Sequence, residues 1–360
     1  MKKLDLYIVR KFLGTFFFAI LLIISIAVVF DLVEKIDDFA EKGAPLKAII
    51  FEYYLNFIPY FANLFTPLFV FIAVIFFTSK MAYDTEIIAI LSSGVSFKRL
   101  MYPYFIGALI IAIISYILGG FIIPPANKVR LNFENGYVKT RKEETKGNVH
   151  MQIAPGVFAY LGGKFNQTTK TATNFTLEKF NANLLVSKLT AKSITYDTIK
   201  NKWVANNYTI RNFKEGRDSE IKTGVKLDTT LNMRPSDFKV ERKFHETMNN
   251  IELNRYINEQ RSRGIGNIEE FVIENYSRNA APFSAFILTL IGVSLASRKV
   301  RGGMGLHIGI GIGLSFIYIL FMTVSKTFAI SGNTNPLFAV WLPNIVFAGV
   351  GIYLYNRAPK

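Results

Sequence analysis

Six long apolar stretches flank one large polar stretch along the 360 residues of this chain. Each apolar stretch lacks Asp, Glu, Lys and Arg and is long enough to cross a membrane as a helix. Three of them precede the polar stretch and three follow it. The predicted spans are 12–30, 53–78, 101–127, 279–297, 302–325 and 327–356, with 337–354 as the buried part of the last one.

The polar stretch, residues 128–278, shows the two-residue period of β-strands in its first part. Ile221 and Val225 are expected on one side of a strand, and Lys222 and Lys226 on the other. Such alternation indicates an antiparallel sheet with one apolar face and one hydrated face. The positions expected in the interior of this domain are Tyr208, Ile210, Ile221 and Val225.

The apolar period becomes helical at about residue 249, where Ile251, Leu253 and Ile257 recur. The chain is therefore expected to be a polytopic α-helical membrane protein with six transmembrane helices and an inserted antiparallel β domain. The predicted regions are spans one to three in 1–127, the β domain in 128–248, a helical return segment in 249–278, and spans four to six in 279–360.

Basic residues are distributed unevenly between the two sides of these spans, and the richer side is expected in the cytosol. One side holds twelve: Lys2, Lys3, Arg10, Lys11, Lys80, Lys98, Arg99, Arg298, Lys299, Arg301, Arg357 and Lys360. The other holds four: Lys35, Lys42, Lys47 and Lys326. Both termini are therefore expected in the cytosol and the β domain outside, which in a bacterium is the periplasm.

Composition narrows the class of protein further. The chain is 51% hydrophobic and 19% charged, which is typical of a multi-span protein with one soluble domain. It has no cysteine, no phosphate-binding loop ending in Gly-Lys-Ser/Thr, and only three scattered histidines, so neither a cofactor nor a metal is expected. The predicted spans contain no charged residue, which argues against an ion-coupled pump. Energy for transport would then come from a partner chain.

The longest predicted cytosolic loop, 80–99, contains a short helix at about 82–93. Acidic residues at its start, Asp84 and Glu86, and a glycine at its end are usual helix limits. Its apolar stripe includes Ile87, Ile90 and Leu91. Such a helix either lies on the membrane surface as a connector or inserts into a groove of a cytosolic partner, and the two alternatives stay open on the residues alone.

The fifth predicted span carries glycines at helical spacing, Gly305, Gly309 and Gly313. Small residues spaced by four allow two helices to approach closely in lipid. Because no strand precedes the span, a dinucleotide site is unsupported and tight helix packing is favoured. His307 is expected to be a packed or interfacial residue.

Several stretches together resemble the LptF/LptG permease family of the lipopolysaccharide export ABC transporter. They are LDLYIVRKFLGTFF, TEIIAILSSGVSFKRL, FIIPPANKVRLNFE, AKSITYDTIKNKWVANNYTIRNF, LNMRPSDF and APFSAFILTLIGVSLASRKVRGG. The resemblance covers essentially the whole chain in order, with chain length and the span-five glycines slightly closer to LptG than to LptF.

The resemblance implies a six-span subunit of the bacterial inner membrane with a periplasmic β-jellyroll. It implies a sister LptF/LptG-type subunit, a cytosolic ABC ATPase dimer and periplasmic jellyroll bridge proteins as partners. The chain itself would not be an enzyme but would extract lipopolysaccharide from the membrane. The helix at 82–93 becomes the ATPase-coupling helix, with Asp84, Glu86, Ile87, Ile90 and Leu91 as its residues, and spans one and five line a lateral gate.

One departure from the family concerns the predicted loop 31–47 after span one. Relatives carry basic residues there, which meet lipid phosphates, whereas DLVEKIDDFAEKG is mostly acidic. Lys35 and Lys42 are the remaining candidates for the lipid head group. Either the head group differs, or a divalent cation bridges it, or the sister subunit supplies the charge.

Two other classes of function are open to this layout. A membrane-anchored enzyme of envelope lipids would need clustered acid, base or metal-binding residues on the outer side, and the sequence offers none. A membrane-anchored scaffold or sensor would use the periplasmic β domain to bind a protein partner at a sheet edge. Copurifying proteins would separate transport from sensing.

Overall fold

The structure is a computed structural model that describes residues 3–138, 149–181, 184–214, 217–238, 244–262, 268–298, 303–332 and 334–358. The chain forms two compact units. The helical unit comprises Met1–Lys139, His245–Leu253 and Glu269–Lys360, and the β unit comprises Thr140–Phe244 and Asn254–Ile268. Four cations of the charge count, Lys2, Lys299, Arg301 and Lys360, lie outside the described residues.

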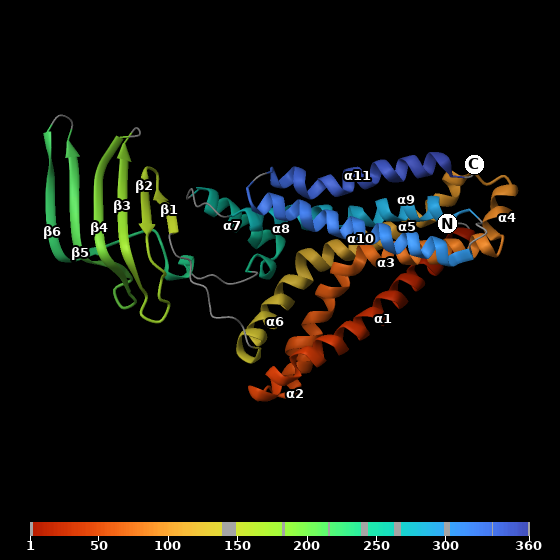
Figure 1. Ribbon diagram of the computed structural model, residues 1–360, viewed down its shortest axis with the longest axis horizontal. Coiled ribbons are helices and arrows are strands. Elements are labelled where there is room, and N and C mark those ends of the chain that lie inside the picture. The colour runs from red at the N-terminus through yellow and green to blue at the C-terminus, as the bar shows by residue number, and fades with distance from the viewer. Residues whose placement is uncertain are drawn as a thin grey trace. The chain divides into compact units, whose positions relative to one another are not determined.

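Five helical segments among the described residues are long and apolar enough to cross a membrane, and the number is six if the bent pair of α8 and α9 is counted as one span. The bend between α8 and α9 is 48°. The helices, shown in Figure 1, are α1 (Lys3–Glu41), α2 (Leu46–Ala48), α3 (Leu55–Tyr83), α4 (Glu86–Ser92), α5 (Phe97–Ile117), α6 (Ile123–Tyr137), α7 (Asn250–Ser262), α8 (Glu269–Ala280), α9 (Phe283–Ala296), α10 (Gly303–Ile330) and α11 (Pro336–Arg357). Two π-helical segments, Ile49–Tyr54 and Leu118–Ile122, join α2 to α3 and α5 to α6.

Helix α1 is much longer than its apolar part. The predicted loop at 31–47 is wrong in its first part, because α1 continues without a break to Glu41. An ion pair between Lys35 and Asp31, one turn apart, supports this polar extension. A helix of 39 residues is about 58 Å long. Since a bilayer core is about 30 Å thick, α1 projects well out of the membrane.

Other helices also run past their apolar parts. Lys326, counted above as a loop residue, lies inside α10, which continues to Ile330. Helix α6 continues to Tyr137, so residues 128–138 belong to the helical unit and not to the β domain. The apolar pattern marks where a helix leaves lipid, whereas hydrogen bonding sets where the helix ends.

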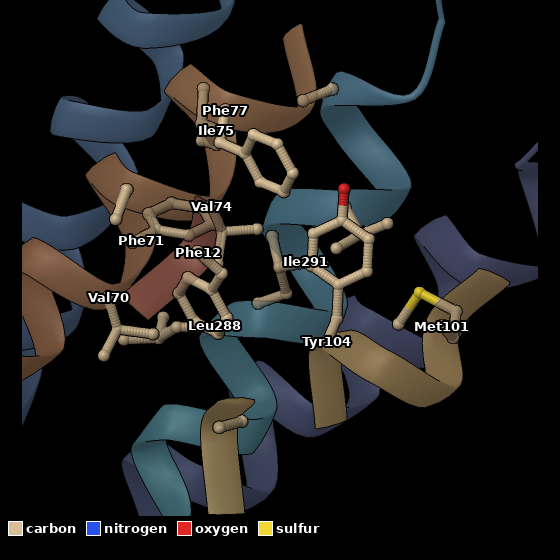
Figure 2. Packing of buried hydrophobic residues seen from close by; sticks show 14 of the residues in the cluster. Phe12, Val70, Phe71, Val74, Ile75, Phe77, Met101, Tyr104, Leu288 and Ile291 are labelled. Carbon is tan, nitrogen blue, oxygen red and sulfur yellow. The ribbon is translucent and has the colours of Figure 1, made fainter. Parts of the chain in front are cut away.

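The core of the helical unit is centred on α3, which packs against α1, α9 and α10. Figure 2 shows Val70, Phe71 and Val74 of α3 pointing toward Leu288 and Ile291 of α9. A Cβ at Gly292 would lie 2.8 Å from Val74 Cγ1, so a glycine is needed for this approach of α9 to α3. Spans from both halves of the sequence therefore share one core.

The β unit contains one six-stranded antiparallel sheet, with strands paired in sequence order. Trp203 and Phe238 are fully buried at one end of its core, and Trp203 Nε1 donates a hydrogen bond to the carbonyl of Met233. The strands are β1 (Val149–Ala154), β2 (Val157–Leu161), β3 (Thr171–Asn181), β4 (Leu184–Asp197), β5 (Lys202–Lys214) and β6 (Arg217–Thr229). The predicted fold class, a polytopic helical membrane protein with a separate antiparallel β domain, is confirmed.

A line of irregular residues crosses the sheet and interrupts the two-residue period. Asn174 in β3 and Asn207 in β5 have φ of 54° and 50°, a left-handed conformation that Asn tolerates. The register places both of them opposite Lys192 of β4. Inward residues are consequently three positions apart across this line: Ala172 and Phe175, Ala191 and Ile194, and Ala205 and Tyr208.

This shift corrects part of the predicted interior. Tyr208 and Ile210 pack against the core as expected. Ile221 pairs with the exposed Arg211, so it lies on the face opposite to Ile210 and is 52% exposed. Val225 lies opposite Asn207 on the irregular line and is 71% exposed. The prediction assumed that inward and outward residues alternate strictly along β6. It was wrong because inward residues on the two sides of the irregular line are three positions apart instead of two.

Candidate functional site

Helix α4 is a separate short helix at the end of the helical unit where α1 begins and α11 ends (Figure 1). Thr85 precedes it with φ of 62° and Gly94 follows it with φ of 85°, so left-handed residues reverse the chain on both sides. Thr85 is not a glycine, and such a conformation costs of order 1–3 kcal/mol unless the surroundings impose it. The sharp entry sets α4 apart from α3.

The apolar stripe of α4 faces the helical core. Ile87 is fully buried, and Ile90 and Leu91 are partly buried against the same cluster. Asp84 and Ile88 are exposed on the outer side of this segment. The predicted stripe therefore anchors α4 to its own unit, and the surface open to a partner is the opposite one.

Glu86 lies between these two sides and is half-buried. Its Oε2 accepts a hydrogen bond of 3.3 Å from the hydroxyl of Tyr7 in α1. A second contact joins α1 to α5, the helix that follows α4, because Asp5 forms an ion pair with Arg99 of α5 at 2.7 Å. The first turns of α1 therefore contact both ends of the α4 segment.

The two head-group candidates lie near the opposite end of α1, and both already have partners. Lys35 Nζ binds Asp31 at 2.7 Å and contacts the hydroxyl of Tyr53. Lys42 is exposed and donates to the carbonyl of Val138 at 2.7 Å. A lipid phosphate that uses Lys35 would have to compete with the Asp31 carboxylate.

A buried group of charges beyond the ends of the predicted spans was missed by the sequence reasoning. Arg130 of α6 is 3% exposed and lies 3.9 Å from Glu134 and 4.0 Å from Glu246. Asn127 also donates to Glu246 at 3.4 Å. These contacts fasten the segment that follows the β domain onto α6, which belongs to the first three spans.

Arg278 fastens the same segment to α8, which belongs to the last three. It is 7% exposed, pairs with Glu274 at 2.7 Å, and donates to the carbonyls of Met248 and His245 at 2.7 and 3.2 Å. The four-residue spacing of Glu274 and Arg278 was the available sequence signal. It is also common on solvated helices, so burial could not be inferred from it. Arg130 and Arg278 lie just outside the predicted spans, so these spans remain free of charged residues, but the helices that extend beyond them do contain buried charges.

A comparison with protein-family models matches residues 6–357 to the lipopolysaccharide export system permease LptF/LptG. The chain belongs to the LptF/LptG family. The match spans both sets of transmembrane helices and the β domain between them, and it does not separate the two sister types. A comparison with curated proteins finds no match.

Membership of the LptF/LptG family makes the chain a transmembrane subunit of lipopolysaccharide export, within an Lpt transporter complex. A permease subunit of this family is a multi-pass protein of the inner membrane and not itself an enzyme. The apolar spans α1, α3, α5, α10 and α11 and the bent α8–α9 pair agree with that class. The separate sheet accounts for the polar middle of the chain.

The glycines of α10 divide into two groups in this LptF/LptG chain. A Cβ at Gly305, Gly309 or Gly313 would meet no atom within 4 Å, whereas a Cβ at Gly311 would overlap Ile75 of α3. Tight packing within the chain therefore uses Gly311, and the other three face outward. His307, 5% exposed, is a packed residue as expected, with its Nδ1 3.1 Å from the hydroxyl of Ser79.

Proposed function

We propose that this chain couples ATP hydrolysis by a separate cytosolic ABC ATPase dimer to the extraction of lipopolysaccharide. The lipid then passes to a periplasmic bridge of jellyroll domains. The observation that carries the proposal is α4: an isolated helix, anchored by Ile87, that leaves Asp84 and Ile88 exposed. An exposed short helix between two spans fits a groove on a cytosolic partner.

The proposed orientation places both termini and α4 in the cytosol and the β domain in the periplasm. Exposed Arg10, Lys11, Lys98 and Arg357 support it, because they lie within the first three turns or the last turn of helices at the α4 end. Lys326, counted on the opposite side, lies near the end of α10.

A test of the whole proposal is to purify the chain from its native membrane in mild detergent and identify its partners. Recovery of a P-loop ATPase and a second LptF/LptG-type chain is expected. The reconstituted complex should release lipopolysaccharide to a soluble jellyroll acceptor only when ATP is hydrolysed. Recovery of a signalling protein instead, with no ATPase, would support the sensor alternative.

A sister subunit would cover the outward faces of α1 and α10. No residue of α1 between Phe16 and Phe39 is buried, and α10 exposes Phe316 and Leu320 along the same side as its open glycines. These two helices would form the lateral gate through which lipid enters between the subunits. Gly305, Gly309 and Gly313 would then permit a close, sliding contact with the sister chain.

Two leucine substitutions in α10 separate packing inside the chain from packing against a sister. Gly311→Leu should lower the stability of the isolated chain by about 1–3 kcal/mol, since the new side chain overlaps Ile75. Gly309→Leu should leave the isolated chain unchanged and reduce recovery of the sister subunit. Thermal unfolding and copurification measure the two effects. Equal sister recovery from Gly309→Leu and wild type would contradict the contact.

The proposed lipid route runs past Lys35 and Lys42 and then over the inward face of the β domain. Tyr208 and Ile210 line this face, while Ile221 and Val225 no longer qualify as interior positions. Tyr208 lies over Gly224 of β6, where a Cβ would be 2.6 Å from its ring. The aromatic ring therefore covers the edge strand that an acyl chain would have to pass.

Photoreactive residues on alternate positions of β5 test this route. A crosslinker at Tyr208 or Ile210 should capture lipopolysaccharide during ATP turnover. The same group at Thr209 or Arg211, which point to the other face, should capture several-fold less. Equal capture on both faces, measured by immunoblot for lipid adducts, would rule out a route confined to the inward face.

A further inference from the structure

The start of α1 is attached to the segment that carries α4 by an ion pair in which Asp5 is buried and the Arg99 side chain is 38% exposed. Arg99 donates from Nη2 to Asp5 Oδ2 at 2.8 Å, and its Nη1 lies 2.7 Å from Oδ1 as an ion contact without hydrogen-bond geometry. Asp5 is 1% exposed, which makes a carboxylate without Arg99 unfavourable at this position. Arg99 lies in the first turn of α5, the next helix after α4, and Tyr7 binds Glu86 at the beginning of α4.

After this ion pair, α1 is packed against the core from Ile8 to Phe16, about two and a half turns. Ile8 and Phe12 are fully buried. The ring of Phe12 occupies the space that a Cβ at Gly107 of α5 would need, and its centroid lies 6.3 Å from that of Tyr104. The first part of α1 and the beginning of α5 are therefore fixed to one another.

The middle of α1 is not held in this way. None of residues 17–38 is buried. A hollow of about 570 Å³ borders its early turns, lined by Tyr7, Arg10, Lys11, Gly14, Thr15, Phe18 and, from α3, Phe76. The hollow borders the early turns of α1, whose buried residues Ile8, Phe12 and Phe16 belong to the same core cluster as Val74.

The far end of α1 is packed again, against aromatic residues of other helices. The ring of Phe39 lies 5.7 Å from Tyr53 and 5.6 Å from Phe133 of α6. The Asp31–Lys35 pair, with Tyr53, is one turn before this cluster. One uninterrupted helix thus joins the α4 end to the candidate head-group residues.

We infer that α1 transmits movement of α4 directly to the Asp31–Lys35 end, with Asp5 and Arg99 as the positioning residues that attach α1 to the moving loop. The inference rests on the proposed coupling role of α4. The residues from Asp5 to Lys35 belong to one continuous α-helix, so a displacement imposed at Asp5 is carried along α1 itself to Lys35. Burial of Asp5, which makes an unpaired carboxylate unfavourable there, keeps Arg99 attached to α1.

Disruption of the ion pair should separate ATP hydrolysis from export. In the full complex in proteoliposomes, Asp5→Asn and Arg99→Gln should bind the ATPase and hydrolyse ATP as wild type does. Lipopolysaccharide released per ATP should fall at least several-fold. The exchanged pair, Asp5→Arg with Arg99→Asp, should restore most of that ratio, which a merely structural defect of either single variant would not predict.

Distance measurement between spin labels provides a second readout for variants that fold but export poorly. The chain has no cysteine, so Ile36→Cys on α1 and Phe338→Cys on α11 are labelled uniquely before assembly. Both positions are exposed. The distance should change on ATP turnover with Asp5 present and stay constant in Asp5→Asn.

Two results would overturn the inference and leave the proposed function intact. One is an unchanged export ratio in both single variants while Glu86→Lys abolishes export. The other is a label distance that still changes on turnover in Asp5→Asn. Failure of the wild-type complex to release lipopolysaccharide with ATP would instead contradict the proposed function itself.

Discussion

Replacing Glu86 with Lys is expected to abolish ATP-driven export while leaving the chain folded. Glu86 is half-buried beside the exposed face of α4, so reversing its charge changes a contact made with a docked partner. Reversal of a charge at an interface typically costs about 2–4 kcal/mol, roughly 30- to 1,000-fold in affinity. Copurification of the ATPase and lipopolysaccharide release from proteoliposomes measure the loss.

Two matched variants show whether that loss comes from docking. Glu52→Lys makes the same charge change at an exposed position near the opposite end of the helical unit, and it should leave ATPase binding unchanged. Tyr7→Phe removes only the hydroxyl that binds Glu86 within the chain. Wild-type ATPase binding by Glu86→Lys would contradict the docking role. Loss of binding in Tyr7→Phe would mean that Glu86 acts through α1.

Arg278→Ala is expected to destabilise the helical unit by about 3–5 kcal/mol, because it removes one partner of a buried ion pair. The substitution leaves Glu274 without its cation and the carbonyls of His245 and Met248 without their donor. Of the contacts that attach residues 245–248 to neighbouring helices, those of Arg130 and Asn127 with Glu246 would remain. Thermal unfolding in detergent should show a markedly lower midpoint.

The control for Arg278 is Arg261→Ala on α7, where the side chain is exposed and the same truncation should have little effect. Arg278→Lys keeps the charge but not the forked geometry, and should be intermediate. An unfolding midpoint for Arg278→Ala equal to that of Arg261→Ala would show that the buried network contributes nothing to stability.

Much of the helical unit could be predicted from local pattern. The absence of charge over about twenty residues identifies a span whatever surrounds it, because lipid excludes charge at every such position. The limits of α4 were partly local: Glu86 lies in its first turn and Gly94 follows its last, but the predicted start at 82 was wrong, because α3 continues to Tyr83 and Asp84 is its C-cap. The helix ends outside lipid were not predictable in this way, as α1 and α10 show, since polar residues are compatible with both helix and loop.

The candidate site was only partly visible in the sequence. Glu86 and the stripe through Ile87 were found from helical spacing, but the same spacing cannot say which face a neighbouring helix will cover. The joint between Asp5 and Arg99 was invisible, because the two residues are separated by 94 positions and each alone resembles an ordinary helix-end charge. Such a pair exists only when α1 and α5 are packed together.

The sequence by itself determined the class of this protein: apolar spans on both sides of a β domain, and a short helix between two spans. Burial was decided only by the tertiary structure. In the tertiary structure Ile87 points inward and no side chain covers Gly309. The irregular residue Asn207 changes which positions of the sheet face the core, so Ile221 points outward. The physical reason is that hydrophobic period is a property of one segment, whereas burial depends on which distant segment comes to cover it.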